Sequence, residues 1–238
     1  MLMKRARPWA MSMRWDDLLF MHWPVRAEVL RPLIPSGLEL DTHDGSAWIG
    51  VVPFGMSHVK PRFVPPLPWI SKFLELNVRT YVTAGGRPGI WFFSLDAANP
   101  LAVRVARRRF HLPYFDARMS VERVAQTIRY RSARTHRGAR PATFSCAYHP
   151  TGPVVHAVAG SLDDFLTNRL CLYSADSAGR IHRGDIDHAP WPLQSATAEI
   201  ERNTMTEAMD VGLPVVAPLL HFAKRLDVVA WRIRPIEE

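Results

Sequence analysis

The sequence predicts a mainly β (α+β) fold in which a mostly antiparallel sheet curls or closes on itself. Short runs of alternating or apolar residues recur along the whole chain, and few segments show helical spacing. Strands and helices do not alternate in the regular rhythm of a parallel α/β sheet. The sequence also contains neither a glycine-rich dinucleotide fingerprint nor a P-loop. These observations favour a curled or closed antiparallel sheet with a few short helices at its periphery.

The first elements are a helix and a strand. Residues 24–34 predict a short helix that is broken at Pro32 and Pro35, because proline interrupts helical hydrogen bonding. A continuous apolar run at 47–54 predicts a buried strand. A proline-rich loop at 61–68 follows and leads to the central part of the sequence.

Two strand-like runs, 75–83 and 90–96, form this central part. The segment between them, 84–89, contains glycines and a proline and is typical of a turn. An antiparallel hairpin is therefore predicted.

Two helices are predicted from their capping residues. Asn99 and Pro100 suit the N-cap and first helical position of a helix that runs to Phe110. Ser161 and Asp164 resemble a capping box and open a short helix through Arg169. The other segments with strand patterns are 115–121, 124–130, 144–148, 172–174, 180–186, 194–201 and 226–233.

Composition favours one domain. A chain of 238 residues with 47% hydrophobic residues can bury a large core, and no low-complexity stretch divides it. We therefore expect a single domain over 1–238, with 1–14 as a candidate poorly ordered N-terminal arm.

The ends of the chain show no membrane signal. Charged residues interrupt the basic N-terminus before an apolar region forms, and the apolar stretch at 211–220 is short and contains two prolines. Cys146 and Cys171 match no zinc-binding spacing, so we expect two reduced, buried thiols. We expect a cytoplasmic protein without a membrane partner.

The formal net charge of +8 suggests nucleic acid as a partner, because clustered cations release phosphate counterions. The positions of the arginines weaken that interpretation. The first group falls late in the helix that ends at Phe110, where cations suit the helix dipole. The second group, at 129, 131, 134, 137 and 140, is expected to decorate a hairpin tip. Without a recognised binding motif, nucleic acid is not an expected partner.

A polar stripe on the first hairpin strand is the main candidate site. In an extended strand, Glu75, Asn77, Arg79 and Tyr81 project from one face. That face could be the solvated side of an amphipathic strand or could line a polar cavity inside a closed sheet, and the residues alone leave both open.

A cavity would give these side chains specific roles. Arg79 could clamp a substrate carboxylate through its planar fork, while Glu75 and Asp96 could act as acids or bases, with Asp96 also counted among the substrate-binding candidates. An internal salt bridge that holds the hairpin is the alternative for the same residues.

Other candidates are less specific. Arg169 and Tyr173 follow the capped helix and could join such a pocket, although a tyrosine is as often a core residue. His188 precedes a stiff segment in which Trp191 could form a pocket wall, although a packed loop is the alternative.

The sequence does not favour metal, cofactor or covalent hydrolase chemistry. His182, Asp185, Asp187 and His188 could ligate a metal, but strand alternation places His182 and Asp185 on opposite faces. No Gly-x-Ser-x-Gly elbow occurs, and neither cysteine lies beside a local histidine. No metal or other cofactor is expected.

Several short sequence motifs between Trp15 and Trp231 resemble the YqjF-like family of uncharacterised bacterial proteins. These motifs lie at 15–19, 22–24, 30–35, 75–82, 91–100, 110–115, 165–167, 190–193 and 219–223. The family is grouped with the acetoacetate decarboxylase-like fold. The resemblance implies a cone-shaped, mostly antiparallel β-barrel with an internal pocket, and such a pocket favours the pocket-lining interpretation of Glu75, Asn77 and Arg79.

The resemblance breaks down at the decarboxylase lysine. Decarboxylases carry a Gly-Phe-Pro-Lys-Lys string, in which a neighbouring cation activates a Schiff-base lysine. The comparable string here is 111–115, His-Leu-Pro-Tyr-Phe, which keeps the proline and lacks both lysines. Lys72 would have to reach in from another element. We therefore expect no acetoacetate decarboxylase activity.

Two functions of different classes remain. One is a lysine-independent lyase or isomerase for a small carboxylate or carbonyl compound, with Arg79 holding the anion and Glu75 as acid or base. His111 or Tyr114 would lie near the former nucleophile position. The alternative is a non-catalytic small-molecule-binding or protein-interaction module. A second copy of the chain is a further candidate partner, because the related fold often assembles.

Overall fold

The computed structural model describes residues 8–67 and 69–236 and confirms a mainly β protein with short helices. Its elements are β1 (Met11–Val25), α1 (Ala27–Leu30), η1 (Arg31–Leu33), β2 (Glu39–Leu40), β3 (Ala47–Pro61), β4 (Phe73–Ala84), β5 (Arg87–Ala97), α2 (Pro100–Phe110), β6 (Tyr114–Val124), β7 (Thr127–Arg134), β8 (Thr143–Pro150), α3 (Leu162–Thr167), β9 (Cys171–Ala175), β10 (Ile181–His188), β11 (Leu193–Asn203), η2 (Glu207–Met209), β12 (Leu219–Ala230) and β13 (Arg234–Pro235). The predicted hairpin is β4 and β5, which pair from Glu75 opposite Ala97 to Ala84 opposite Arg87.

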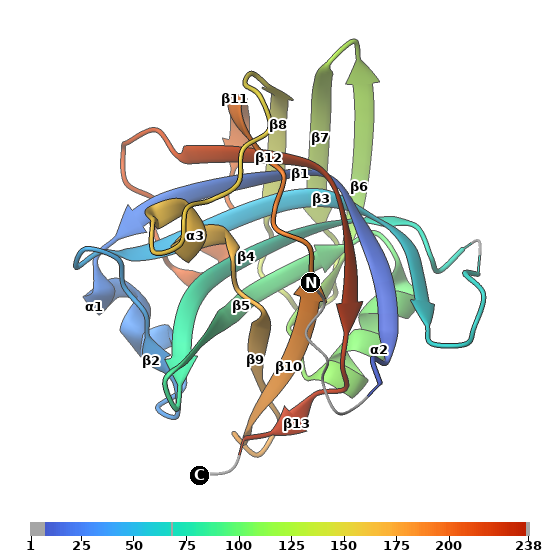
Figure 1. The fold of residues 1–238 in the computed structure, drawn as a ribbon, viewed down its shortest axis with the longest axis vertical. Coiled ribbons are helices and arrows are strands. Elements are labelled where there is room, and N and C mark those ends of the chain that lie inside the picture. Colours follow the sequence, from blue (N-terminus) through green and yellow to red (C-terminus); the bar gives the residue numbers. More distant parts are fainter. Residues whose placement is uncertain (1–7, 68, 237–238) are drawn as a thin grey trace.

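The strands form one 13-stranded sheet that closes on itself twice (Figure 1). On the edge away from β4, β5 pairs with β9 near its start and with β6 near its end, and both of these pairings are parallel. In the same way, β12 pairs with β11 in one half and with β10 in the other. The other described strand pairs are antiparallel, as predicted.

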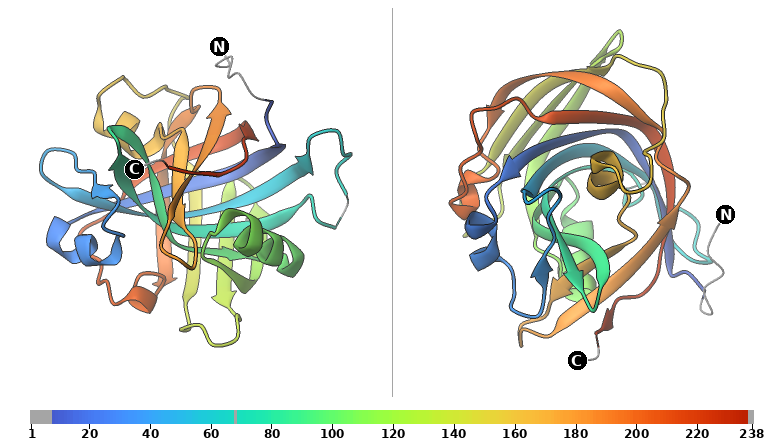
Figure 2. Two further views of the ribbon diagram at one scale, coloured as in Figure 1. Left: turned by 90° about the horizontal axis from the view of Figure 1, so that it is seen from below. Right: turned by 60° about the vertical axis from the view of Figure 1, so that its left-hand side comes forward.

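These branch points create two rings of strands that share β12, β1, β3, β4 and β5. The larger ring is completed by β6, β7, β8 and β11, and the smaller ring by β9 and β10. Helix α3 lies within the outline of the smaller ring in the right-hand view of Figure 2. Each shared strand therefore turns one face toward each ring.

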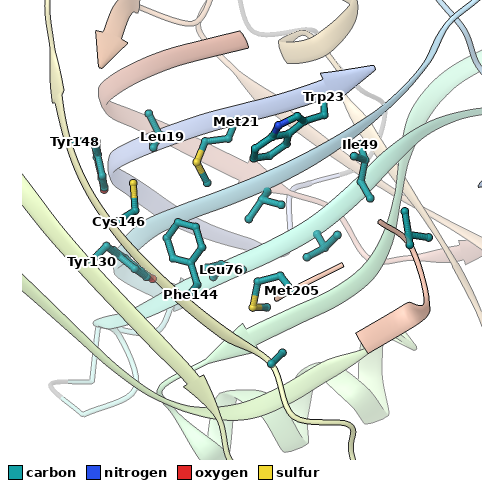
Figure 3. Close-up of a cluster of buried hydrophobic side chains, with 14 of the residues drawn as sticks. Leu19, Met21, Trp23, Ile49, Leu76, Tyr130, Phe144, Cys146, Tyr148 and Met205 are labelled. Carbon is teal, nitrogen blue, oxygen red and sulfur yellow. The ribbon is translucent and has the colours of Figure 1, made fainter. Parts of the chain in front are cut away.

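The main hydrophobic core fills the larger ring (Figure 3). Leu76 of β4, Met21 of β1, and Tyr130 and Phe144 from β7 and β8 pack together there and are almost completely buried. Burial of this apolar surface is the main force that holds the strands in a ring.

Both faces of β4 are buried, because the strand separates the two rings. Leu76 and Val78 belong to the core of the larger ring, and every residue from 75 to 82 is buried. The polar face of this strand is thus not a solvated surface.

Several expectations about single elements are confirmed. Asn99 caps α2 by accepting hydrogen bonds from the backbone of Leu101 and Ala102. Ser161 accepts from the backbone of Asp164 and caps α3. Cys146 and Cys171 are free and buried.

Other expectations are corrected. The run at 124–130 is not one strand, because a turn at 125–126 separates β6 from β7. The last long strand, β12, begins at Leu219, seven residues earlier than the pattern 226–233 indicates, because Leu219 to Ala223 also pair with β1. Helix α3 ends at Thr167, two residues before Arg169.

The N-terminal arm expected over 1–14 overlaps the sheet, since β1 begins at Met11. Residues 1–7 of that arm lie outside the described residues. Within 8–67 and 69–236, no helix is long and apolar enough to cross a membrane.

Candidate functional site

Glu75 and Tyr114 form a buried pair at one end of the polar stripe. The Tyr114 hydroxyl donates a hydrogen bond of 2.8 Å to Oε2 of Glu75. Burial raises the pKa of Glu75 to about 8, and the nearby Asp96 adds to this effect, whereas the Tyr114 hydrogen bond opposes it. Burial and the neighbouring Glu75 also hold the pKa of Tyr114 well above its usual value. At neutral pH most Glu75 side chains are therefore protonated.

Arg79 lies further along the same strand, and no acidic side chain among the described residues pairs with it. The residue is 6% exposed. Its Nη2 donates to the carbonyl oxygen of Leu166 at 3.2 Å, and the guanidinium lies over the Phe20 ring, 5.0 Å from the centroid. Its Nε is buried and makes no hydrogen bond to any described group.

Asn77 lies between Glu75 and Arg79 in the stripe. Its Oδ1 is buried and also has no hydrogen-bond partner in the described part of the chain. A buried polar atom without a partner costs about 1–3 kcal/mol, so an unpaired donor and an unpaired acceptor on neighbouring stripe residues require an explanation.

His22 and Tyr81 complete the polar face beside Arg79. The Tyr81 hydroxyl is 2.7 Å from Nε2 of His22 and donates to the Leu166 carbonyl at 2.7 Å. Burial, with Arg79 nearby, holds the pKa of His22 well below its usual value, so its imidazole is neutral. A Cβ at Gly50 would lie 3.0 Å from the His22 ring and 3.4 Å from Cγ of Arg79, which shows that both side chains flank this glycine.

Helix α3 covers this group of side chains. Its Leu166 carbonyl accepts hydrogen bonds from both Tyr81 and Arg79. Near the start of the helix, Oδ1 of Asp163 is 3.0 Å from Nε2 of His221 on β12. The helix is therefore fixed to the smaller ring through its own polar groups.

Aromatic rings connect Arg79 with a surface cleft. Trp15 stacks on Trp191 with ring centroids 5.6 Å apart, and Trp191 meets the edge of Phe20 at 4.9 Å. Trp191 and His188 help line a cleft of about 230 Å³ beside α3. A larger, shallow hollow of about 480 Å³ between α1 and β2 contains none of the predicted site residues.

Asp96 lies on the opposite face of the sheet from the stripe. It is paired in register with Leu76, and directly opposed residues share a face of the sheet, so Asp96 points into the larger ring. Arg134 binds both of its carboxylate oxygens, at 2.7 to 3.1 Å, and both side chains are almost fully buried. Burial raises the pKa of Asp96, and Arg134 opposes that shift.

This pair corrects one expectation from the sequence. Arg134 does not decorate a hairpin tip with its neighbours, because its side chain lies inside the larger ring, whereas Arg129 and Arg131 are exposed as expected.

The remaining candidates lie apart from the stripe or are internally paired. His111 is the left-handed C-cap of α2, and its ring lies 4.9 Å from the ring of His182 on β10. Nη1 of Arg169 forms an ion pair of 2.7 Å with Asp41. The Tyr173 hydroxyl donates to the backbone of Arg87.

The described residues contain no group of three or more histidine, cysteine, aspartate or glutamate side chains that could hold a metal ion. Of the lysines described by the structure, Lys72 and Lys224 are exposed and Lys60 is half-buried. Lys4 lies outside the described residues.

Sequence reasoning missed His22 as a site residue and did not separate Asp96 from the stripe. The signal for His22 was a histidine in the otherwise apolar second half of β1, residues 18–25, where a histidine is more often a satisfied core residue. Tyr81 was placed on the correct face, but its partners His22 and Leu166 come from distant parts of the chain. Only the closure of the smaller ring brings them together.

Comparison with known proteins gives one family. The model of the family DUF2071, an uncharacterized conserved protein, matches residues 12–227. Over 226 residues the chain is 47% identical to the uncharacterized protein YqjF of Bacillus subtilis (strain 168), covering 95% of this chain and 92% of that protein.

Solved structures with little sequence identity share the fold. The enduracididine biosynthesis enzyme MppR complexed with pyruvate matches with a TM-score of 0.65 and 13% identity over 99% of this chain and 92% of that chain. An acetoacetate decarboxylase matches with a TM-score of 0.62 and 13% identity over 97% and 90% of the two chains. An acetoacetate decarboxylase-like enzyme from Sphingomonas wittichii RW1 matches with a TM-score of 0.64 and 13% identity over 98% and 95%. The fold is therefore acetoacetate decarboxylase-like.

Proposed function

The chain belongs to the DUF2071 family, and we propose that it binds a small carboxylate or carbonyl compound against the polar face of β4 and transfers a proton without a lysine. The observation that carries this proposal is Arg79, a buried guanidinium without an acidic partner among the described residues. A buried charge is costly unless it is paired. A carboxylate bound to Arg79 through charge-assisted hydrogen bonds would offset that cost.

Glu75 is the proposed acid and base. Its pKa of about 8 lies close to neutral pH, where a carboxyl group can both donate and accept a proton at useful rates. Tyr114 holds Oε2 in place through its hydrogen bond. Perturbed carboxyl groups of this kind cluster at functional sites, which supports a catalytic role for Glu75.

The proposed route to Arg79 begins at the cleft beside α3. Trp191 lines that cleft, and its ring contacts Phe20, over which the Arg79 guanidinium lies. The cleft is smaller than the 300–1,000 Å³ that is typical of ligand sites, so it suits a compound of few heavy atoms.

A separate observation supports a reaction that does not use a Schiff-base lysine. A Schiff base needs a neutral amine, which proteins obtain by burying a lysine or placing it beside another cation. The string at 111–115 contains no lysine, and Lys72 is exposed. MppR is described in complex with pyruvate, and that small 2-oxo acid supports the choice of ligand size only.

Thermal unfolding in the presence of small carboxylates, 2-oxo acids and diketones tests the proposal. A ligand at 100 times its Kd adds about 2.7 kcal/mol, which raises the Tm of a chain of this length by about 5 to 10 °C. We expect at least one carboxylate to do so for the wild type and for the control variant Arg14→Met, which removes a half-buried arginine paired with Asp227 on β12, but not for Arg79→Met.

Turnover is then followed by NMR with the ligand that binds. Wild-type protein should convert it, and Glu75→Gln should bind it without conversion. Binding without conversion by both proteins would leave the non-catalytic binding module as the function. A panel in which no compound stabilises the wild type contradicts the proposal.

A further inference from the structure

The hydrogen positions around Tyr81 follow from its two short contacts. The Leu166 carbonyl cannot donate, so the hydrogen in the 2.7 Å contact between these groups comes from the Tyr81 hydroxyl. That hydroxyl has no second hydrogen for His22 Nε2, which also lies 2.7 Å away. Nε2 of His22 must therefore carry a hydrogen and donate it to the Tyr81 oxygen.

This assignment fixes the chemistry of the other ring nitrogen of His22. The residue is completely buried and its imidazole is neutral, so it carries one ring hydrogen. Because Nε2 holds that hydrogen, Nδ1 carries a lone pair. Nδ1 is buried and finds no donor among the described residues.

Three unpaired atoms now have known hydrogen-bonding roles. His22 Nδ1 and Asn77 Oδ1 are acceptors, and Arg79 Nε is a donor on a cation. All three residues are more than nine-tenths buried. A ligand that satisfied them would present an anionic acceptor to Arg79 and a hydrogen-bond donor to at least one of the two acceptors.

We propose that the ligand of this site is a small hydroxy acid, whose carboxylate binds Arg79 and whose hydroxyl donates to His22 Nδ1. This inference rests on the proposed function and narrows its substrate class. A 2-oxo acid offers acceptors only and would leave both His22 Nδ1 and Asn77 Oδ1 unpaired. An amino acid would place its ammonium group close to the Arg79 cation, which disfavours it. His22 is thus the residue that determines specificity.

Calorimetric titration with compounds matched in size tests this inference. The probes are 2-hydroxypropanoate, 2-oxopropanoate and propanoate, and their four-carbon counterparts with the hydroxyl or oxo group at carbon 3. In at least one series we expect the hydroxy acid to bind the wild type about tenfold or more tightly than both other acids, because they lack the donor.

Two variants separate the contributions. His22→Phe keeps an aromatic ring on Phe20 but removes the acceptor, so the preference for the hydroxy acid should disappear while propanoate binding stays within about threefold. Arg79→Met should bind none of the acids, because it lacks the cation that holds their carboxylate. Equal binding of the three acids by the wild type would overturn the hydroxy-acid assignment and leave the proposed function intact. Failure of every acid to bind the wild type would also overturn the hydroxy-acid assignment, whereas the proposed function is contradicted only if no compound of the wider thermal unfolding panel stabilises the wild type.

A second measurement keeps the inference testable if His22→Phe fails to fold. The ¹⁵N chemical shifts of the His22 ring report which nitrogen carries the hydrogen. We expect the Nε2-protonated tautomer in the free protein, and a change in the Nδ1 signal on addition of the hydroxy acid. A ring protonated on Nδ1 would overturn the inference.

Discussion

The two faces of the hairpin of β4 and β5 bury charged groups in opposite ways. On the face toward the larger ring, Asp96 is bound through both oxygens by Arg134, and the charges compensate each other. On the face toward the smaller ring, Arg79 has no acidic partner among the described residues and leaves Nε unpaired. The same strands thus hold one charge-compensated ion pair and one buried guanidinium without an acidic partner among the described residues, and the guanidinium is where we place the ligand.

Breaking the completed pair should give the largest effect. Arg134→Met leaves Asp96 buried without its cation, so we expect the free energy of unfolding to fall by about 3–5 kcal/mol. Urea unfolding followed by circular dichroism measures it. The matched change Arg79→Met should cost about 1 kcal/mol or less, because it leaves no carboxylate unpaired. A comparable loss in both variants would show that the two faces do not differ.

Glu75 gives the next effect, and it depends on pH. Its pKa is raised in the folded protein to about 8, so between pH 4.5 and 8 the unfolded chain loses a proton that the folded chain keeps. Stability from this group therefore falls as the pH rises through that window. Glu75→Gln removes the dependence and should be more stable than the wild type by up to roughly 3–4 kcal/mol at pH 8, but by little at pH 4.5. A constant difference across these pH values would contradict the raised pKa.

A substitution at Gly50 tests whether the ligand binds on the face of the hairpin toward the smaller ring. Gly50→Ala places a Cβ 3.0 Å from the His22 ring, so we expect a loss of about 1–3 kcal/mol and a weaker response to ligand. Gly212 provides a control, because a Cβ there has no heavy atom within 4 Å. Gly212→Ala should stay within about 0.5 kcal/mol of the wild type and bind normally. An unchanged ligand response in Gly50→Ala would argue against a site beside His22.

The smallest effect is expected at Lys72. Its side chain is exposed, so Lys72→Met should change stability by less than about 0.5 kcal/mol and leave ligand binding and turnover unchanged. Activity assays of this variant check the lysine-independent chemistry. Loss of turnover with binding retained would indicate that Lys72 reaches the ligand.

The sequence was sufficient for the fold class and for the polar stripe, because period-two alternation places Glu75, Asn77, Arg79 and Tyr81 on one face of an extended strand. The resemblance to a family indicated that this face points inward. Alternation along one strand could not identify the hydrogen-bond partners of these side chains, because those partners come from other elements that approach only when the rings close. Arg134 reaches Asp96 from β7, and Leu166 reaches Tyr81 from α3. For this reason Asp96 was grouped with the stripe although it lies on the opposite face, and His22 was not selected.

The most direct test combines the two arginine variants with a ligand. Unfolding free energies of wild type, Arg79→Met and Arg134→Met are measured with and without the carboxylate that stabilises the wild type most. We predict that Arg134→Met is much less stable but gains about as much from the ligand as the wild type. Arg79→Met should be close to the wild type in stability and gain nothing. A ligand response that survives in Arg79→Met and disappears in Arg134→Met would contradict the assignment of the site to the smaller ring.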